Sequence, residues 1–217
     1  MNVEALRSWL LQQKITRERF SLPYSEEQVK DMLTAAVQAE VSYRHQSYRE
    51  SEEMNSYIAQ ASSWLVNQDK FGLLLCGVPG NGKTTLMRAI QSLLNILDLK
   101  DANNQSVGVV MVDAREIARL NKDNYEAFRN YRQRPMLAID DLGLEPAAVM
   151  DYGNILNPVI DLLSYRYDEQ LFTIVTTNLK PSQIREKYKD RIADRFNEMM
   201  EKIIFKNGSY RGQNTQK

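Results

Sequence analysis

One glycine-rich segment constrains the fold and chemistry of this chain more than any other feature. Residues 77–84 read Gly-Val-Pro-Gly-Asn-Gly-Lys-Thr and match the phosphate-binding pattern G-x-x-x-x-G-K-[ST]. An apolar run, residues 71–76, precedes the segment, and a helical pattern follows it from Thr85. In that context the glycines let the backbone curl, so that successive N–H groups point at phosphate oxygens beside the positive end of a helix dipole. The segment therefore predicts a nucleotide-binding site.

Two side chains of this segment have separate expected roles. Lys83 is expected to reach the β- and γ-phosphates of the nucleotide, and the Thr84 hydroxyl is expected to hold Mg²⁺. A turn that only joins a strand to a helix is the alternative, and the flanking patterns argue against it. The residues expected to bind the nucleotide here are Gly77, Val78, Pro79, Gly80, Asn81, Gly82, Lys83, Thr84 and Thr85.

A second candidate site follows the apolar run 136–139, where Asp140 and Asp141 stand side by side. A strand that ends in acids is the partner that a phosphate loop of this kind requires. We expect Asp140 to hold Mg²⁺ through water and Asp141 to polarise the water that attacks ATP. Two acids that merely cap a strand end are the alternative, and the phosphate loop upstream favours the catalytic role.

A third candidate is Asn178, at the polar end of the segment Phe-Thr-Ile-Val-Thr-Thr-Asn that begins at Phe172. The segment reads as a buried strand, and we expect its end to lie beside the strand that carries Asp140. Asn178 would then orient water against the γ-phosphate. An ordinary transition from strand to loop is the alternative.

A fourth candidate is the pair Arg191 and Arg195 on the helical stretch 182–200. The i, i+4 spacing places both guanidinium groups on one helix face. Two arginines suit phosphate charge, either in their own subunit or in a neighbouring one. A solvated basic face, with Asp190 and Asp194 as local partners, explains the spacing equally well.

The order of apolar runs and helical patterns predicts the fold class. Helices are expected at residues 3–14, from a capping box that begins at Ser25, and at 52–68. From residue 71 short apolar runs alternate with helices, which is typical of a mostly parallel sheet with helices on both faces. The expected strands are 71–76, 107–112, 135–139, 171–176 and 202–206.

Length and composition agree with an α/β P-loop NTPase fold that follows a helical N-terminal segment. The 217 residues suit one domain with an appendage, and 43% of them are hydrophobic, enough for a substantial core. We place the N-terminal segment at residues 1–50 and the nucleotide-binding domain at 51–217. The early segment holds none of the nucleotide motifs and is the candidate for binding a protein partner.

Charge and cysteine content exclude several classes of protein. The chain has 28 basic and 28 acidic residues, so it is not a bulk polyanion binder, and nucleic-acid contact requires a local patch or an assembly. Cys76 is the single cysteine, which excludes a disulfide within the chain and fits a reducing cytoplasm. No apolar run approaches the ~18 residues of a membrane span, and the first residues lack an export signal. We therefore expect a cytoplasmic protein without membrane contact.

Residues 115–134 form a candidate surface for single-stranded DNA. Tyr125, Phe128 and Tyr131 alternate there with basic residues, a combination that suits phosphate contact and base stacking. The same aromatic residues recur every third position, as in a helix stripe that faces a core, so both interpretations stay open. The basic residues are Arg115, Arg119, Lys122, Arg129, Arg132 and Arg134, and the acidic ones are Glu116, Asp123 and Glu126.

Taken together, these motifs resemble AAA+ ATPases, and more narrowly the DnaC/IstB-like group of helicase loaders and transposition helper ATPases. The resemblance covers about residues 60–211. It depends on residues 77–84, on Leu-Ala-Ile-Asp-Asp-Leu-Gly at 137–143, on Ser-Tyr-Arg-Tyr at 164–167, on Thr-Thr-Asn-Leu at 176–179, and on the stretch from Arg191 to the closing Gly-Ser-Tyr-Arg at 208–211.

The resemblance implies a role for each candidate residue. Asp140 and Asp141 would be the Walker B acids, Asn178 would be sensor 1, and Arg211 would match the sensor 2 position. Arg191 and Arg195 would lie in the arginine-finger helix. The family also implies ATP-dependent homo-oligomers on single-stranded DNA, with a helical insertion that touches DNA in the region 115–134, and a replicative helicase or transposase client bound by the N-terminal part.

Two departures from the family pattern are visible in the sequence. Many AAA+ proteins carry glutamate at the second Walker B position, where this chain has Asp141, and the shorter carboxylate is expected to slow hydrolysis. The sequence continues for only six residues after Arg211, so a separate C-terminal helical lid is not expected.

The main functional hypothesis is an ATPase that loads a DNA helicase or related client onto single-stranded DNA. A transposition helper ATPase of the same fold is the first alternative. A small-molecule P-loop kinase and a nucleotide-dependent adaptor without hydrolysis are alternatives from other classes. The stretch 182–211 argues against the kinase, which would need a substrate-binding lid with paired arginines.

Overall fold

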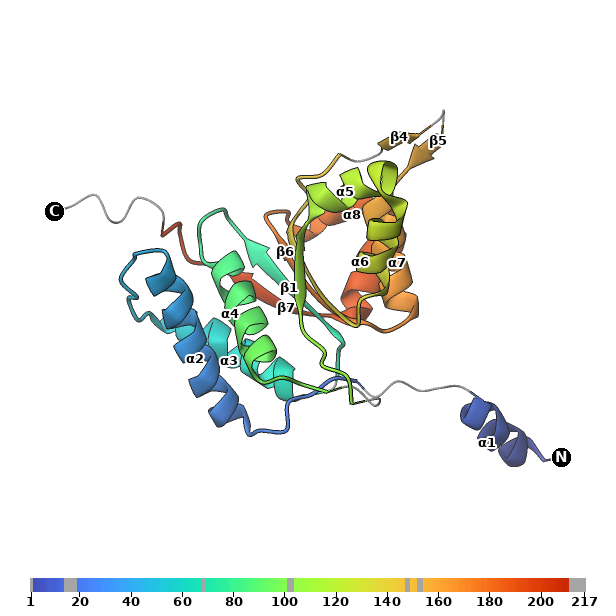
Figure 1. The fold of residues 1–217 in the computed structure, drawn as a ribbon, viewed down its shortest axis with the longest axis horizontal. Coiled ribbons are helices and arrows are strands. Elements are labelled where there is room, and N and C mark those ends of the chain that lie inside the picture. The colour runs from blue at the N-terminus through green and yellow to red at the C-terminus, as the bar shows by residue number, and fades with distance from the viewer. Residues whose placement is uncertain are drawn as a thin grey trace.

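A five-stranded parallel sheet forms the centre of the molecule (Figure 1). The structure is a computed structural model that describes residues 2–13, 19–67, 69–100, 104–146, 149–151 and 154–210. The strand order is β2-β3-β6-β1-β7, and every neighbouring pair runs parallel. The strands are β1 (Gly72–Gly77), β2 (Val110–Asp113), β3 (Met136–Leu142), β6 (Phe172–Thr177) and β7 (Met200–Phe205). The predicted parallel five-stranded P-loop fold is therefore confirmed.

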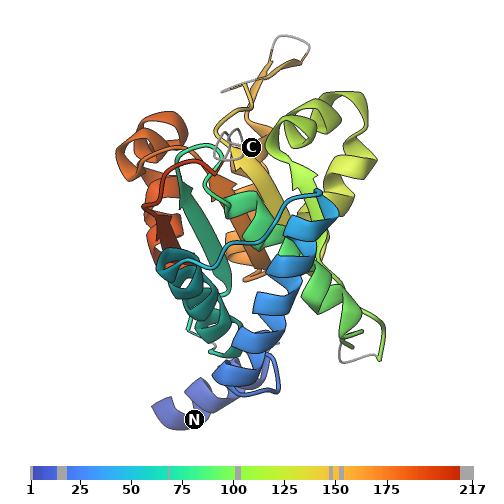
Figure 2. The same ribbon diagram turned by 90° about the vertical axis from the view of Figure 1, so that its left-hand side faces the viewer.

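Helices cover both faces of this sheet (Figures 1 and 2). Because successive side chains of a strand point to opposite faces, Leu73 and Leu75 of β1 pack in one apolar cluster, whereas Leu74 and Cys76 pack in another. The first cluster includes α2 (Glu26–Tyr43), α3 (Glu52–Val66) and α4 (Lys83–Ile96). The second includes α5 (Ala114–Asp123), α6 (Tyr125–Gln133), α7 (Pro158–Asp168) and α8 (Pro181–Met199). A short antiparallel pair, β4 (Val149–Asp151) and β5 (Asn154–Leu156), projects between β3 and α7.

Helix α2 shares its core with the nucleotide-binding domain, although it precedes the expected domain start at residue 51. It begins after Ser25, whose capping box was predicted. Its apolar stripe, Val29, Leu33 and Val37, is buried in the same cluster as the apolar side chains of α4. The boundary at residue 50 stays a prediction, and the packing shows that part of the N-terminal segment is structurally joined to the domain.

Helix α1 (Val3–Gln13) lies apart from the rest of the described chain (Figure 1). Its predicted apolar side is exposed, since the side chains of Val3 and Trp9 are 83% and 52% accessible. Leu6 and Leu10 on the same side are exposed as well. This helix therefore presents an apolar stripe to solvent.

Arg166 on α7 is a fully buried arginine that joins three elements of the second cluster. Its Nη1 donates to the carbonyl oxygen of Arg134, just after α6, at 2.7 Å. Its Nη2 donates to the carbonyl oxygen of Phe172 at 2.6 Å, and its Nε donates to Thr173 Oγ1 at 2.9 Å. The guanidinium group thus fastens the end of α6 to the start of β6.

Candidate nucleotide-binding site

The phosphate loop leads from β1 into α4 at the carboxyl edge of the sheet. Gly80 and Gly82 have φ angles of 81° and 102°, in the left-handed region that glycine adopts at little cost. A Cβ atom on Gly82 would also lie 2.8 Å from Cε of Met54. Lys83 opens α4, and its Nζ donates to the carbonyl oxygen of Gly77 at 2.8 Å. The ammonium group therefore lies inside the loop, where it would meet phosphate oxygens.

Thr84 and Asp140 face each other at the centre of the sheet edge. The Thr84 hydroxyl donates to Asp140 Oδ1 at 3.0 Å, and the hydroxyl of Thr176 donates to the same oxygen at 2.5 Å. The contact between Thr176 and Asp140 arises because β6 and β3 are neighbouring strands, as predicted. Hydroxyl and carboxylate oxygens are ligands that Mg²⁺ accepts, so the donor set fits a magnesium ion. The described residues hold no cluster of three His, Cys, Asp or Glu side chains for a metal.

Asp141 occupies an irregular point of β3. Its φ angle is 56°, and the register between β3 and β6 shifts between Ile139 and Leu142. A shift of this kind can re-aim a side chain, and Asp141 lines the cavity described below. Burial raises the pKa of the Asp141 carboxyl, and the neighbouring charges of Asp140 and Asp113 raise it further. A carboxyl with a raised pKa is a stronger proton acceptor once it is ionised.

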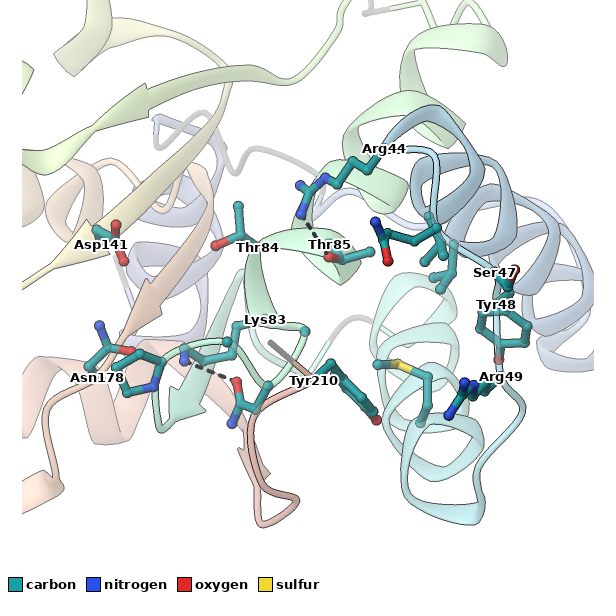
Figure 3. A pocket seen from close by; sticks show the side chains of 18 of the residues that line it. Arg44, Ser47, Tyr48, Arg49, Lys83, Thr84, Thr85, Asp141, Asn178 and Tyr210 are labelled. Atoms are coloured by element: carbon teal, nitrogen blue, oxygen red, sulfur yellow. Dashed lines mark hydrogen bonds between the residues drawn. The ribbon is translucent and has the colours of Figure 1, made fainter. Parts of the chain in front are cut away.

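A cavity of about 830 Å³ brings two of the predicted catalytic side chains, Asp141 and Asn178, together with the phosphate loop (Figure 3). Asp141 and Asn178 lie at one end of the cavity, close to Lys83. Asn178 follows β6 directly, so the end of this strand carries it to the site. From the loop and α4, the lining residues are Pro79, Gly80, Asn81, Gly82, Lys83, Thr84 and Thr85.

The opposite wall of the cavity consists of residues for which the sequence predicted no part in nucleotide binding. It comes from the end of α2, the following loop, the first turn of α3 and the C-terminal segment. The backbone N–H of Tyr210 donates to the carbonyl oxygen of Gly80 at 2.9 Å, which holds that segment on the phosphate loop. Tyr210 belongs to the noted Ser-Tyr-Arg motif, whereas no motif marked residues 41–49. Among the lining residues of this wall are Val37, Val41, Arg44, Gln46, Ser47, Tyr48, Arg49, Met54 and Tyr210.

Neither Arg191 nor Arg195 lines this cavity. Arg195 pairs with Asp168 Oδ1 at 3.0 Å, and its guanidinium carbon lies 4.6 Å from the ring centre of Tyr167. Arg191 is exposed. Both follow Lys189, where a φ angle of 68° breaks α8. Within one chain these arginines therefore lie outside the site. Arg211 lies outside the residues that the structure describes.

The candidate DNA surface at residues 115–134 forms α5 and α6, and the aromatic side chains of its stripe differ in their exposure to solvent. Phe128 is fully buried, as the core interpretation predicts, whereas the Tyr125 side chain is 57% exposed. Three of the basic residues pair with acids: Arg115 with Asp113, Arg119 with Glu116, and Arg132 with Asp161.

Comparisons with known proteins agree with this geometry. The solved structure of DnaI is similar with a TM-score of 0.59 and 22% identity, covering 88% of this chain and 96% of that one. The DnaC helicase loader gives 0.56 and 21%, with coverage of 73% and 93%. A structure of the replication initiator DnaA bound to AMPPCP and single-stranded DNA gives 0.53 and 16%, covering 74% of this chain and 49% of that one. At these identities the likeness concerns the fold.

Among curated protein sequences no match is found. In the described parts of the chain, no helix has both the length and the apolar character to cross a membrane. The family described as "ATPase family associated with various cellular activities (AAA)" matches residues 73–202, from the first strand of the sheet into the last. Because this match covers more than half of the sequence, and the phosphate loop, the paired acids and the strand order agree with it, the chain belongs to the AAA family of ATPases.

Proposed function

We propose that this protein is a Mg²⁺-dependent ATPase that uses ATP-dependent assembly to recruit or load a DNA helicase or related client onto single-stranded DNA. The observation that carries the ATPase activity is the convergence of Lys83, Asp141 and Asn178 on one cavity. The Thr84–Asp140 contact lies beside them at the same sheet edge. Fold similarity to DnaI and to the DnaC helicase loader supports the replication role.

The proposed reaction is attack of water on the γ-phosphorus, with cleavage of its bond to the oxygen of the departing ADP. Lys83 and the N-terminus of α4 hold the β- and γ-phosphates. Thr84 and Asp140 would hold Mg²⁺, which neutralises charge on the phosphates when it is bound. Asp141 accepts the hydrogen bond of the attacking water and so raises its nucleophilicity, and the Asn178 amide keeps that water in line.

A neighbouring subunit would complete this site with an arginine. Arg191 or Arg195 would approach the γ-phosphate of the next subunit, and fingers of this type raise turnover by roughly 10³–10⁵. Arg195 first has to leave its pair with Asp168, whereas Arg191 is already exposed. An ATP-dependent homo-oligomer follows from this shared site.

Two surfaces of the described chain, one on α1 and one on α5 and α6, are the proposed binding sites for partners. The exposed apolar side of α1 would bind the client, either a replicative helicase or a transposase. Helices α5 and α6 would contact single-stranded DNA through Tyr125 and the basic residues around it. The DnaA structure with bound single-stranded DNA has a related fold, which supports single-stranded DNA as a partner.

Phosphate release from ATP tests the proposal, measured across protein concentration with and without single-stranded DNA. Wild-type turnover should rise faster than linearly with concentration. Lys83→Ala should lose ATP binding, whereas Lys30→Ala, on an exposed turn of α2, should leave it unchanged. ATP binding by Lys83→Ala as tight as that of the parent would refute the site. Tight binding without turnover would instead indicate a nucleotide-dependent adaptor.

Mixing variants tests the shared site. Arg191→Ala and Arg195→Ala should bind ATP, and the one that removes the finger should be inactive alone. That variant should regain partial activity when it is mixed with Lys83→Ala, because one interface then combines an intact loop with an intact arginine. Turnover that stays strictly proportional to concentration, with no recovery in either mixture, would exclude a finger in trans.

A further inference from the structure

We propose that Arg44 is a second phosphate-binding cation of the nucleotide site, contributed by the loop after α2 and directed at the phosphates nearest the sugar. The inference rests on the proposed nucleotide site and adds a residue that lies outside the matched family segment, residues 73–202. Arg44 lines the cavity together with the phosphate loop.

The backbone around Arg44 forms a tight turn at the end of α2. The N–H groups of Arg44 and Gln46 both donate to the carbonyl oxygen of Val41, at 3.1 and 3.2 Å. His45 has a φ angle of 56°, and its N–H donates to the carbonyl oxygen of Ser42 at 2.9 Å. Three hydrogen bonds and one left-handed residue therefore set the direction in which the chain leaves the helix, and they place Arg44 at the rim of the cavity.

Packing holds this turn in place relative to the phosphate loop. The buried stripe of α2, represented by Leu33 and Val37, lies in one apolar cluster with Met87 of α4. On the same interface the Ser92 hydroxyl of α4 donates to Glu40 Oε1 of α2 at 2.9 Å. Because α4 also carries the phosphate-binding N-terminus, these contacts join the turn after α2 to the helix that would hold the phosphates.

The guanidinium group of Arg44 reaches the first turn of α4. Its Nη1 lies 3.4 Å from Thr85 Oγ1, to which it donates (Figure 3). Asp141 lies at one end of the cavity and Tyr48 at the other, and Arg44 stands between them, over Thr85. The end at Asp141 is the one that would hold the γ-phosphate. Arg44 therefore faces the part of the phosphate chain closer to the sugar.

Electrostatics favour an anion between Arg44 and α4. A cation beside a helix N-terminus is repelled by the positive end of the helix dipole. Among the described residues, no carboxylate pairs with Arg44. Its guanidinium group instead donates to the neutral hydroxyl of Thr85. A phosphate group at this position would interact favourably with the guanidinium group and with the helix N-terminus together.

Binding of ATP and of ADP to the full chain tests this role, measured separately by calorimetry. Arg44→Ala should weaken both nucleotides about tenfold or more and by similar factors, because both carry the phosphates near the sugar. The affinities of Arg44→Lys for both nucleotides should lie between those of the wild type and of Arg44→Ala, since lysine keeps the charge and loses the planar fork. Lys30→Ala removes one charge from the same helix on an exposed turn and should change neither affinity.

Three results would overturn the assignment. Unchanged affinity of Arg44→Ala for both nucleotides would remove its role while leaving the nucleotide site intact. Loss of ATP affinity alone would place Arg44 at the γ-phosphate. A lower melting temperature of nucleotide-free Arg44→Ala, with normal affinity at lower temperature, would assign it a purely structural function. If the wild type bound neither nucleotide, the proposed ATPase site itself would fail.

Discussion

Replacing Arg166 by methionine tests how much a buried guanidinium group contributes to the stability of this fold. Methionine is shorter than arginine but unbranched and flexible, so it refills much of the volume while it removes the hydrogen-bond donors. The three shortest bonds, at 2.6 to 2.9 Å, go to the carbonyl oxygens of Phe172 and Arg134 and to Thr173 Oγ1. Each buried acceptor that loses its donor costs about 1–3 kcal/mol.

Burial of the charge acts in the opposite direction. It lowers the pKa of the Arg166 guanidinium to about 9, so the folded state carries a charge at neutral pH that the unfolded chain would solvate better. Removing that charge offsets part of the loss. We expect a net decrease of about 3 kcal/mol in the free energy of unfolding, similar to breaking other buried charged contacts. For a chain of this size the melting temperature should fall by roughly 6–12 °C.

Urea denaturation followed by circular dichroism measures this difference. Arg166→Lys keeps the charge but cannot reproduce the planar fork, so it should also destabilise the protein clearly. Arg129→Met on the exposed side of α6 is the matched control and should stay within about 0.5 kcal/mol of wild type. If Arg166→Met unfolds at the wild-type urea concentration, the carbonyl oxygens around Arg166 do not need its donors and the expected loss of stability is refuted.

Three further changes test the site and the core. Asp141→Asn should bind ATP and Mg²⁺ normally and hydrolyse ATP very slowly. Asp140→Asn should instead weaken the Mg²⁺ dependence of ATP binding. If ATP binding by the two variants depended on Mg²⁺ concentration in the same way, the division of roles would be refuted. Leu33→Ala should lower the free energy of unfolding by about 3 kcal/mol in urea, with Lys30→Ala as the neutral control, because Leu33 is fully buried in the apolar cluster that α2 shares with α4. Cys76 should react with iodoacetamide at pH 8 only after unfolding, since burial raises its pKa to about 11; rapid labelling of the native protein, detected by mass spectrometry, would contradict its placement.

The features of this protein that are built from consecutive residues could be determined from the sequence. The phosphate loop is one continuous segment, so its glycines, Lys83 and Thr84 can be recognised without any knowledge of the fold. The alternating apolar runs predicted the five strands to within a few residues. Because parallel strands end at one sheet edge, the acids near the end of β3 and Asn178 after β6 could be expected near the loop before their neighbours were known.

Tertiary structure decided everything that depends on segments distant in the chain. Arg44 and Tyr210 enter the cavity through the packing of α2 on α4 and through a backbone hydrogen bond to Gly80, and neither contact leaves a local pattern. The i, i+4 spacing likewise could not show that Arg195 pairs with Asp168 on another helix. Local periodicity records which face of an element is apolar, whereas the identity of the neighbour across that face is set by the whole folded chain.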